Sequence, residues 1–312
     1  MSDYTPAELA GVLRDGLLSF PVTPFTRDLA VDEAALAAHL EWQSGFAIGG
    51  LFIAGGTGEG FSLTPQEHRT VTRAAVATVR TGVPVLSSAG GNTAQALALA
   101  RQAEEAGADG LLLLPPYLTE TTQEGLHDHA AAVLRATRLG VILYNRANAV
   151  YAADTVTRLA QAHPNLIGFK DGNGDLEQLA RVLSANGDRL FYLGGLPTAE
   201  TFALPLLQLG LSTYSSAMFN FAPEFALEFY RDVRAQDRAA VQRRLTDFVL
   251  PYLDIRDRGN GYGVSIVKAG MRAVGRDAGP VRPPLRDLSP AEQERLNTLV
   301  ATVTAPATAV DA

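Results

Sequence analysis

The sequence of 312 residues contains no cysteine, which excludes disulfide bonds, thiolate catalysis and cysteine-ligated metal sites. It has no basic run of five or more residues and a formal net charge of −7, so nucleic acid is not an expected partner. Its longest apolar runs are far shorter than the ~20 residues of a membrane-spanning helix. The N-terminal segment lacks the basic start and apolar stretch of a signal peptide, and we therefore expect a cytoplasmic protein without membrane contact.

Lysine is almost absent, because Lys170 and Lys268 are the only lysines among 26 basic residues. Arginine serves well as a surface cation, but its pKa above 12 prevents it from acting as an amine nucleophile. A lysine retained in a chain that otherwise uses arginine is therefore a candidate for amine chemistry. Lys268 falls in a helical pattern near the C-terminus, and we expect it to be structural.

Short apolar runs alternate with longer helical patterns over most of the chain. The predicted strands lie at 17–25, 50–55, 84–90, 110–116, 141–145, 166–171, 190–195 and 211–216. The helical patterns that follow them lie at 32–46, 64–80, 92–106, 123–138, 153–162, 175–185, 199–208 and 222–235. Apolar strands covered by helices are typical of parallel sheets, and eight such units predict an α/β fold, a (β/α)8 TIM barrel over residues 1–233. A doubly wound open sheet is the competing architecture, which the eightfold count disfavours.

No strand pattern follows residue 234. Helical patterns at about 236–254, 262–275 and 290–302 predict a C-terminal three-helix appendage over residues 234–303. The remaining residues, 304–312, are mostly small and polar, and we expect a disordered tail there.

Lys170 is the candidate nucleophile, because functional groups of a β/α barrel gather at the C-terminal ends of its strands. Side chains alternate along a strand, so an inward-pointing Lys170 would share its face with Gly168, which would clear space beside the amine. Burial disfavours the ammonium form, lowers the pKa and supplies free amine for Schiff-base formation. The alternative is a lysine that reaches solvent or pairs with Asp171.

Tyr144 ends the preceding predicted strand. Its phenol could move protons between the amine, the carbinolamine and a substrate carbon. The alternative is a core tyrosine with a satisfied hydroxyl.

Closely spaced glycines follow the second predicted strand, in the segment Gly55-Gly-Thr-Gly-Glu59. The register of a dinucleotide fingerprint fails there, and no acidic residue ends the next strand. A backbone nest is the better interpretation, in which N–H groups and the Thr57 hydroxyl bind a carboxylate. A plain tight turn is the alternative.

Signatures of other catalytic classes are missing. His127 and His129 lie two positions apart in a helical pattern, which directs them to different faces. The sequence has no His-Glu-x-x-His motif, no clustered carboxylates at strand ends and no Gly-x-Ser-x-Gly elbow. We therefore expect neither a metal nor another cofactor.

These motifs resemble the dihydrodipicolinate synthase and N-acetylneuraminate lyase superfamily, in the same order and over essentially the whole chain. The resemblance runs through Val22-Thr-Pro-Phe25, Gly55-Gly-Thr-Gly-Glu59, Pro115-Pro-Tyr117, Gln123-Glu-Gly125, Tyr144-Asn145 and Gly168-Phe-Lys170. It implies a barrel with C-terminal helices, usually assembled as a homotetramer, a dimer of dimers. It also implies that Lys170 forms an imine with a 2-keto acid, that Tyr144 moves protons, and that the Gly56-Thr57 turn holds the keto acid's carboxylate.

Three departures separate the chain from the synthase. Gly56 stands where a hydroxyl residue is usual and Leu118 where a second aromatic is usual, so the synthase's proton relay cannot exist here. Ala149 stands where the synthase has an arginine, while Arg146 and Asn148 occupy the same loop. Dihydrodipicolinate synthesis is therefore not expected.

The variants Gly-Gly-Thr-Gly-Glu, Pro-Pro-Tyr-Leu, Tyr-Asn-Arg-x-Asn and Phe-Lys-Asp-Gly look most like the 5-dehydro-4-deoxyglucarate dehydratase branch. That resemblance implies conversion of a six-carbon keto-diacid to 2,5-dioxopentanoate, with loss of water and carbon dioxide. Arg146 is then the candidate for the distal carboxylate, because a guanidinium grips carboxylates bidentately. Asn148, Gly195, Ser215 and Ser216 are further candidates for substrate binding. The alternatives are a class I aldolase of the superfamily, which would cleave a 2-keto-3-deoxy sugar acid to pyruvate and an aldehyde, and a non-catalytic keto-acid-binding protein.

Overall fold

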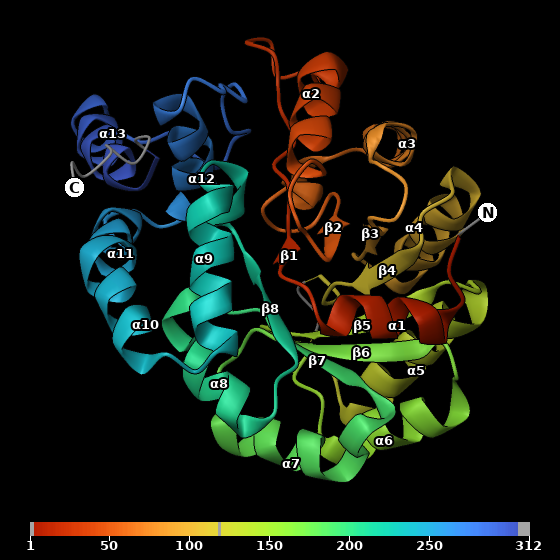
Figure 1. The fold of residues 1–312 in the computed structure, drawn as a ribbon. Coiled ribbons are helices and arrows are strands. Elements are labelled where there is room, and N and C mark those ends of the chain that lie inside the picture. Colours follow the sequence, from red (N-terminus) through yellow and green to blue (C-terminus); the bar gives the residue numbers. More distant parts are fainter. Residues whose placement is uncertain (1–2, 118–119, 305–312) are drawn as a thin grey trace.

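The structure is a computed structural model that describes residues 3–117 and 120–304. Eight parallel strands pair in chain order, and the eighth closes on the first, which confirms the predicted (β/α)8 barrel (Figure 1). The strands are β1 (Leu18–Ser19), β2 (Gly50–Phe52), β3 (Val85–Ala89), β4 (Gly110–Leu113), β5 (Gly140–Asn145), β6 (Leu166–Asp171), β7 (Phe191–Gly194) and β8 (Thr213–Ser216).

Helices alternate with these strands and continue after them. They are α1 (Pro6–Arg14), α2 (Glu33–Gln43), α3 (Pro65–Thr78), α4 (Thr93–Ala106), α5 (Gln123–Ala136), α6 (Ala153–Ala162), α7 (Leu176–Asn186), α8 (Ala203–Leu209), α9 (Pro223–Arg234), α10 (Arg238–Arg244), α11 (Leu250–Arg256), α12 (Tyr262–Ala273) and α13 (Pro290–Thr304). Shorter helical segments are η1 (Gly60–Ser62), η2 (Gly187–Arg189), η3 (Ala199–Phe202), η4 (Met218–Asn220) and η5 (Leu245–Val249). Each predicted strand overlaps an observed one.

Local sequence signals explain where several helices begin and end. Thr64 and Glu67 form a reciprocal capping box at the start of α3, where each side chain accepts the other residue's backbone N–H. The side chain of Asn92 caps α4 and that of Asp175 caps α7. Gly107 ends α4 in the left-handed conformation that glycine adopts without strain.

A separate apolar cluster fills the inside of the barrel. Phe191 and Leu193 of β7 belong to it, together with residues of β1 to β6. Leu9 and Leu13 of α1 join the same cluster and are fully buried, so α1 closes the N-terminal end of the barrel. This helix is not among the predicted elements.

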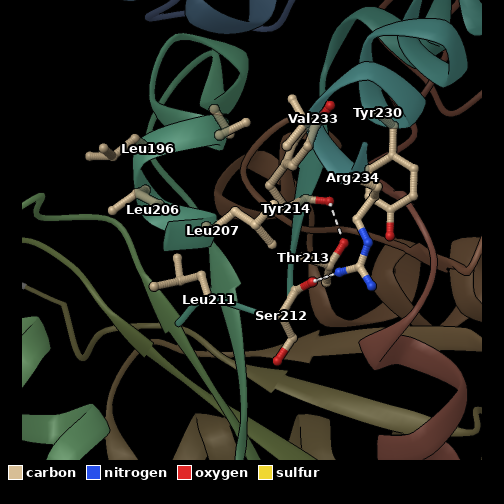
Figure 2. A pocket seen from close by; sticks show the side chains of 13 residues that line it. Leu196, Leu206, Leu207, Leu211, Ser212, Thr213, Tyr214, Tyr230, Val233 and Arg234 are labelled. Atoms are coloured by element: carbon tan, nitrogen blue, oxygen red, sulfur yellow. Dashed lines mark hydrogen bonds between the residues drawn. The ribbon is translucent and has the colours of Figure 1, made fainter. Parts of the chain in front are cut away.

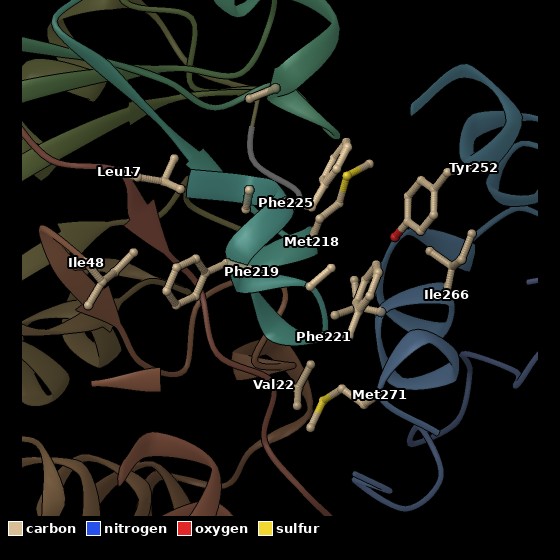
Figure 3. Packing of buried hydrophobic residues seen from close by; sticks show 14 of the residues in the cluster. Leu17, Val22, Ile48, Met218, Phe219, Phe221, Phe225, Tyr252, Ile266 and Met271 are labelled. Carbon is tan, nitrogen blue, oxygen red and sulfur yellow. The ribbon is translucent and has the colours of Figure 1, made fainter. Parts of the chain in front are cut away.

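The C-terminal helices pack against the outside of the barrel. Figure 3 shows Phe219 and Phe221, which follow β8, lying between the barrel and side chains of the C-terminal helices such as Ile266 and Met271. One buried cluster therefore contains residues from both regions, and the division into a barrel (1–233) and a helical region (234–303) remains a proposal. Thr304 ends α13, whereas the rest of the expected tail and Leu118 lie outside the described residues. None of the helices in the described part of the chain has the length and hydropathy that a bilayer crossing requires.

Candidate active site

The Lys170 side chain lies inside the barrel at the C-terminal end of β6. Lys170 pairs with Tyr144 of β5 and with Leu193 of β7, and residues paired in a parallel sheet face the same side. Only 5% of Lys170 is exposed. Its Nζ lies 3.6 Å from the ring centroid of Phe20 and 4.5 Å from that of Tyr144, so two aromatic rings border the amine.

The surroundings of Lys170 favour the neutral amine. Burial holds the pKa of Lys170 well below its usual range, and the nearby guanidinium of Arg146 lowers it further. Asp171 does not offset this, because its carboxylate accepts hydrogen bonds from Asn145 Nδ2 and from the N–H of Gly174, each at 3.0 Å. The alternative pairing of Lys170 with Asp171 is therefore wrong.

The Tyr144 hydroxyl forms hydrogen bonds with Gly195 and Arg146. The hydroxyl donates to the carbonyl of Gly195 at 3.0 Å and accepts from Arg146 Nη1 at 3.4 Å. Burial raises the pKa of Tyr144, and the Arg146 guanidinium opposes that shift in part. The phenol is therefore protonated near neutral pH, in the form that can donate a proton.

Glycine clears the space beside Lys170, but at a different position from the one predicted. A Cβ at Gly168 would lie 2.6 Å from the ring of Phe191, so that space is occupied by the ring and not by the amine. A Cβ at Gly195 would lie 2.4 Å from Lys170 Cε. Gly195, predicted as a substrate-binding residue, thus accommodates the lysine stem and accepts the Tyr144 hydrogen bond.

The glycine-rich turn after β2 is bounded by two residues in the left-handed region, Ala54 at φ 54° and Glu59 at φ 52°. Hydrogen bonds from Glu59 N to Gly56 O and from Gly60 N to Gly55 O close it. Among the described residues, the N–H groups of Gly56 and Thr57 meet no protein acceptor, and Gly56 is exposed. The turn therefore has the free donors that a carboxylate nest requires.

The loop after β5 carries Arg146 and Asn148. The Arg146 guanidinium carbon lies 6.0 Å from the ring centroid of Tyr144, which places this cation beside the phenol. Asn148 Nδ2 donates to the carbonyl of Pro116 at 2.8 Å, so its amide ties this loop to the segment after β4.

The two serines of β8 face opposite sides of the sheet. Ser215 pairs with Leu18, which belongs to the inner cluster. Ser216 is buried, pairs with Ser19 and donates its hydroxyl to the buried carboxylate of Glu200. The prediction that Ser216 contacts substrate is therefore wrong, because side-chain alternation turns it toward the helix layer.

Tyr214, the neighbour of Ser215, also points away from the barrel interior and lines an apolar cavity between the sheet and the helices outside it. Figure 2 shows its lining, in which Tyr214 of β8 faces Leu207 of α8 and Val233 of α9. The lining does not include Lys170, so this cavity is separate from the amine. Within the described residues, no group of three or more histidine, aspartate or glutamate side chains is placed to hold a metal ion.

Sequence reasoning missed Phe20 and Glu200. The alternation of Leu18 and Phe20 along the first strand could have placed the Phe20 ring inside the barrel. Glu200 carries no comparable signal, because a glutamate near the start of a helical pattern is ordinarily exposed.

The chain belongs to the dihydrodipicolinate synthetase family, whose model matches residues 14–304. Solved structures support the same assignment. The dihydrodipicolinate synthase from Bacillus clausii superposes with a TM-score of 0.86 at 25% identity, covering 94% of this chain and 99% of its own. The family member YagE from Escherichia coli K12, solved in complex with pyruvate, superposes with a TM-score of 0.82 at 26% identity, covering 93% and 98%.

Relatives of higher identity bear a name that agrees with the branch the motif variants resemble. A protein of Pseudarthrobacter chlorophenolicus named "Probable 5-dehydro-4-deoxyglucarate dehydratase" is 66% identical over 97% of this chain and 100% of its own length. A protein of Corynebacterium glutamicum with the same name is 64% identical over 97% and 96%. These relatives are named as dehydratases, which are lyases.

Proposed function

We propose that this chain is a decarboxylating dehydratase that converts 5-dehydro-4-deoxyglucarate to 2,5-dioxopentanoate, carbon dioxide and water. One observation supports it most: a buried Lys170 amine with a strongly lowered pKa, bordered by the Tyr144 ring. Such an amine is a Schiff-base nucleophile near neutral pH. The departures from the synthase at Gly56 and Ala149, together with the names of the relatives, favour the dehydratase over the synthase.

In the proposed reaction, the Lys170 amine attacks the keto carbon, and the carbinolamine loses water to give a protonated imine. The imine acidifies the neighbouring methylene, whose proton leaves through Tyr144 and a water molecule or the substrate carboxylate. The electron pair of the broken C–H bond forms an enamine, which expels the β-hydroxyl; the hydroxyl takes up a proton and leaves as water, and an unsaturated imine remains. The distal carboxylate then leaves as carbon dioxide, and the electron pair of its C–C bond passes into the conjugated imine. The resulting enol takes up a proton at carbon and becomes the aldehyde, and hydrolysis of the imine returns the amine and the five-carbon product.

The two ends of the substrate would bind at opposite sides of this amine. We assign the carboxylate next to the keto group to the N–H groups of Gly56 and Thr57 and to the Thr57 hydroxyl. We assign the distal carboxylate to Arg146, with Ser215 and Asn148 near the substrate's hydroxyls. Gly195 contributes by making room for the lysine.

Product analysis tests the reaction. Purified protein with 5-dehydro-4-deoxyglucarate should release carbon dioxide and 2,5-dioxopentanoate, and borohydride with substrate should trap an adduct on Lys170. Lys170→Ala should abolish both signals. Release of pyruvate instead would show an aldolase, and pyruvate binding without turnover would show a keto-acid-binding protein.

Arg146→Ala tests recognition of the distal carboxylate, provided that turnover and pyruvate binding are compared above the acid limb of the trapping rate, where Lys170 is neutral with or without the guanidinium. It should lower turnover of the diacid far more than it weakens pyruvate binding, because only the diacid has a distal carboxylate. Equal effects on both would remove Arg146 from the distal site.

The expected homotetramer and cytoplasmic location remain part of this proposal. Light scattering coupled to gel filtration would give the oligomeric mass, and cell fractionation would give the location. A monomer in solution, or recovery of the protein outside the cytoplasmic fraction, would overturn the respective expectation.

A further inference from the structure

The second lysine of the chain forms a buried ion pair beneath the glycine-rich turn. Lys268 of α12 and Glu59 of the turn are both fully buried, and Lys268 Nζ lies 2.8 Å from Glu59 Oε1. The other carboxylate oxygen, Oε2, accepts the backbone N–H of Arg282 at 2.9 Å. One carboxylate thus joins the turn after β2 to two segments of the C-terminal region, more than 200 residues away in the chain.

Further contacts from the C-terminal region and from the segment after β1 surround this ion pair and the turn. Lys268 Nζ also donates to the carbonyl of Pro280 at 2.8 Å and lies 4.2 Å from the ring centroid of Phe25. The Thr23 hydroxyl donates to the carbonyl of Gly58 at 2.6 Å. The segment after β1 and the C-terminal region therefore both fix residues that directly follow Gly56 and Thr57.

The turn needs such support because its glycine-rich sequence does not fix the backbone conformation. Glycine gives the backbone wide conformational freedom, and Glu59 occupies the left-handed region that a residue with a Cβ rarely adopts. Free N–H groups bind a carboxylate well only when their directions are fixed before the ligand arrives. A buried carboxylate held by an ammonium and an N–H fixes the last residue of the turn.

We propose that Glu59 and Lys268 are positioning residues for the carboxylate-binding turn, so that the C-terminal helical region takes part in keto-acid binding. The inference rests on the proposed function, in which Gly56 and Thr57 hold the keto acid's carboxylate. The pair touches no substrate and acts only through the geometry of the turn.

Borohydride trapping with pyruvate tests the inference on the full chain. Lys268→Met should raise the pyruvate concentration for half-maximal trapping by about 10-fold or more, since misplacing a binding group by about 1 Å has large effects. Trapping at saturating pyruvate should stay near the wild-type rate, because Lys170 itself is untouched. Glu59→Gln should shift the half-maximal concentration in the same direction, and it decides the question if Lys268→Met does not fold.

The directions in which Lys268→Met and Glu59→Gln shift the half-maximal pyruvate concentration distinguish a positioning role from a simple charge effect. Loss of a cation would weaken anion binding and loss of an anion would strengthen it, so opposite shifts would show a simple charge effect and overturn the inference. Arg244→Met is the matched control, because it breaks a partly buried ion pair with Asp232 that joins α10 to α9. It should lower the melting temperature without moving the half-maximal pyruvate concentration.

The trapping assay also distinguishes failure of the inference from failure of the proposed function. Unchanged half-maximal concentrations in Lys268→Met and Glu59→Gln, with wild-type protein trapping normally, would overturn the positioning role alone. Absence of trapping in the wild-type protein would overturn the Schiff-base function itself.

Discussion

Replacing Gly195 by alanine would place a methyl group against the side chain of the proposed nucleophile. The new Cβ would lie 2.4 Å from Lys170 Cε, 2.6 Å from Lys170 Cγ and 2.9 Å from the carbonyl oxygen of Asp171. Nonbonded carbon atoms pack at about 3.5–4.0 Å, so the lysine stem must move by about 1 Å or more. The Asp171 oxygen belongs to the backbone and accepts the Gly195 N–H, so the turn cannot simply retreat.

We expect Gly195→Ala to slow diacid turnover by about 100-fold or more, because misplacing a reacting group by 1 Å has effects of that order. Overpacking should also cost about 1–3 kcal/mol of the free energy of unfolding. The assays are kcat/KM, the rate of borohydride trapping with pyruvate, and urea denaturation.

Gly110→Ala is the matched control for this substitution. Its Cβ would lie 2.7 Å from Leu9 Cδ2 and 2.9 Å from Leu86 Cδ2, which overpacks the end of the barrel that α1 closes. It should lower stability while trapping continues at the wild-type rate. A folded Gly195→Ala protein that traps pyruvate as fast as the wild type would refute the role of Gly195 beside the amine.

Three further outcomes follow from the same site and its surroundings. Tyr144→Phe should reduce kcat by about 10²–10⁴-fold, the usual contribution of a proton-transfer group, with a small change in melting temperature; near wild-type kcat would exclude the phenol from proton transfer. Arg146→Ala should raise the pKa of Lys170 by removing a nearby positive charge, so the acid limb of the trapping rate should move to higher pH. An unmoved limb would show that the guanidinium does not act on the amine. Burial lowers the pKa of His39 from 6.5 to about 4, so the unfolded chain binds more protons in that range and stability falls as pH drops from 6.5 towards 4. The loss attributable to His39 is at most about 3 kcal/mol, and His39→Gln should flatten the pH dependence of the urea midpoint; an unchanged dependence would exclude His39 as its source.

The order of apolar runs was enough to predict the barrel and the strand that carries Lys170. Each run is bounded by turn or cap residues, and the parallel pairing of consecutive strands follows from the helical patterns between them. Lys170 and Tyr144 could be placed side by side for the same reason, because both end neighbouring strands. The helix α1 lies before the first strand, so the repeat of strands and helices does not predict it.

Contacts between residues that lie far apart in the chain could not be predicted from the local pattern of apolar and polar residues. Gly168 shares a face with Lys170, yet the space it leaves is filled by Phe191 from the next strand, and the space beside the amine comes from Gly195. A position at a strand end does not say which of Ser215 and Ser216 faces the barrel interior, because the two side chains point to opposite sides of the sheet. The ion pair of Glu59 has no local signal, because its partners Lys268 and Arg282 follow it by more than 200 residues.

The two lysines show how the surroundings of one residue type separate two roles. Burial lowers the pKa of both side chains. At Lys268 the Glu59 carboxylate opposes that shift, whereas at Lys170 the Arg146 guanidinium adds to it. Because Lys170 is bordered by the rings of Phe20 and Tyr144 and has no carboxylate partner among the described residues, it favours the neutral amine that attacks a carbonyl. The same chain thus keeps one lysine paired for structure and one unpaired for the chemistry that we propose.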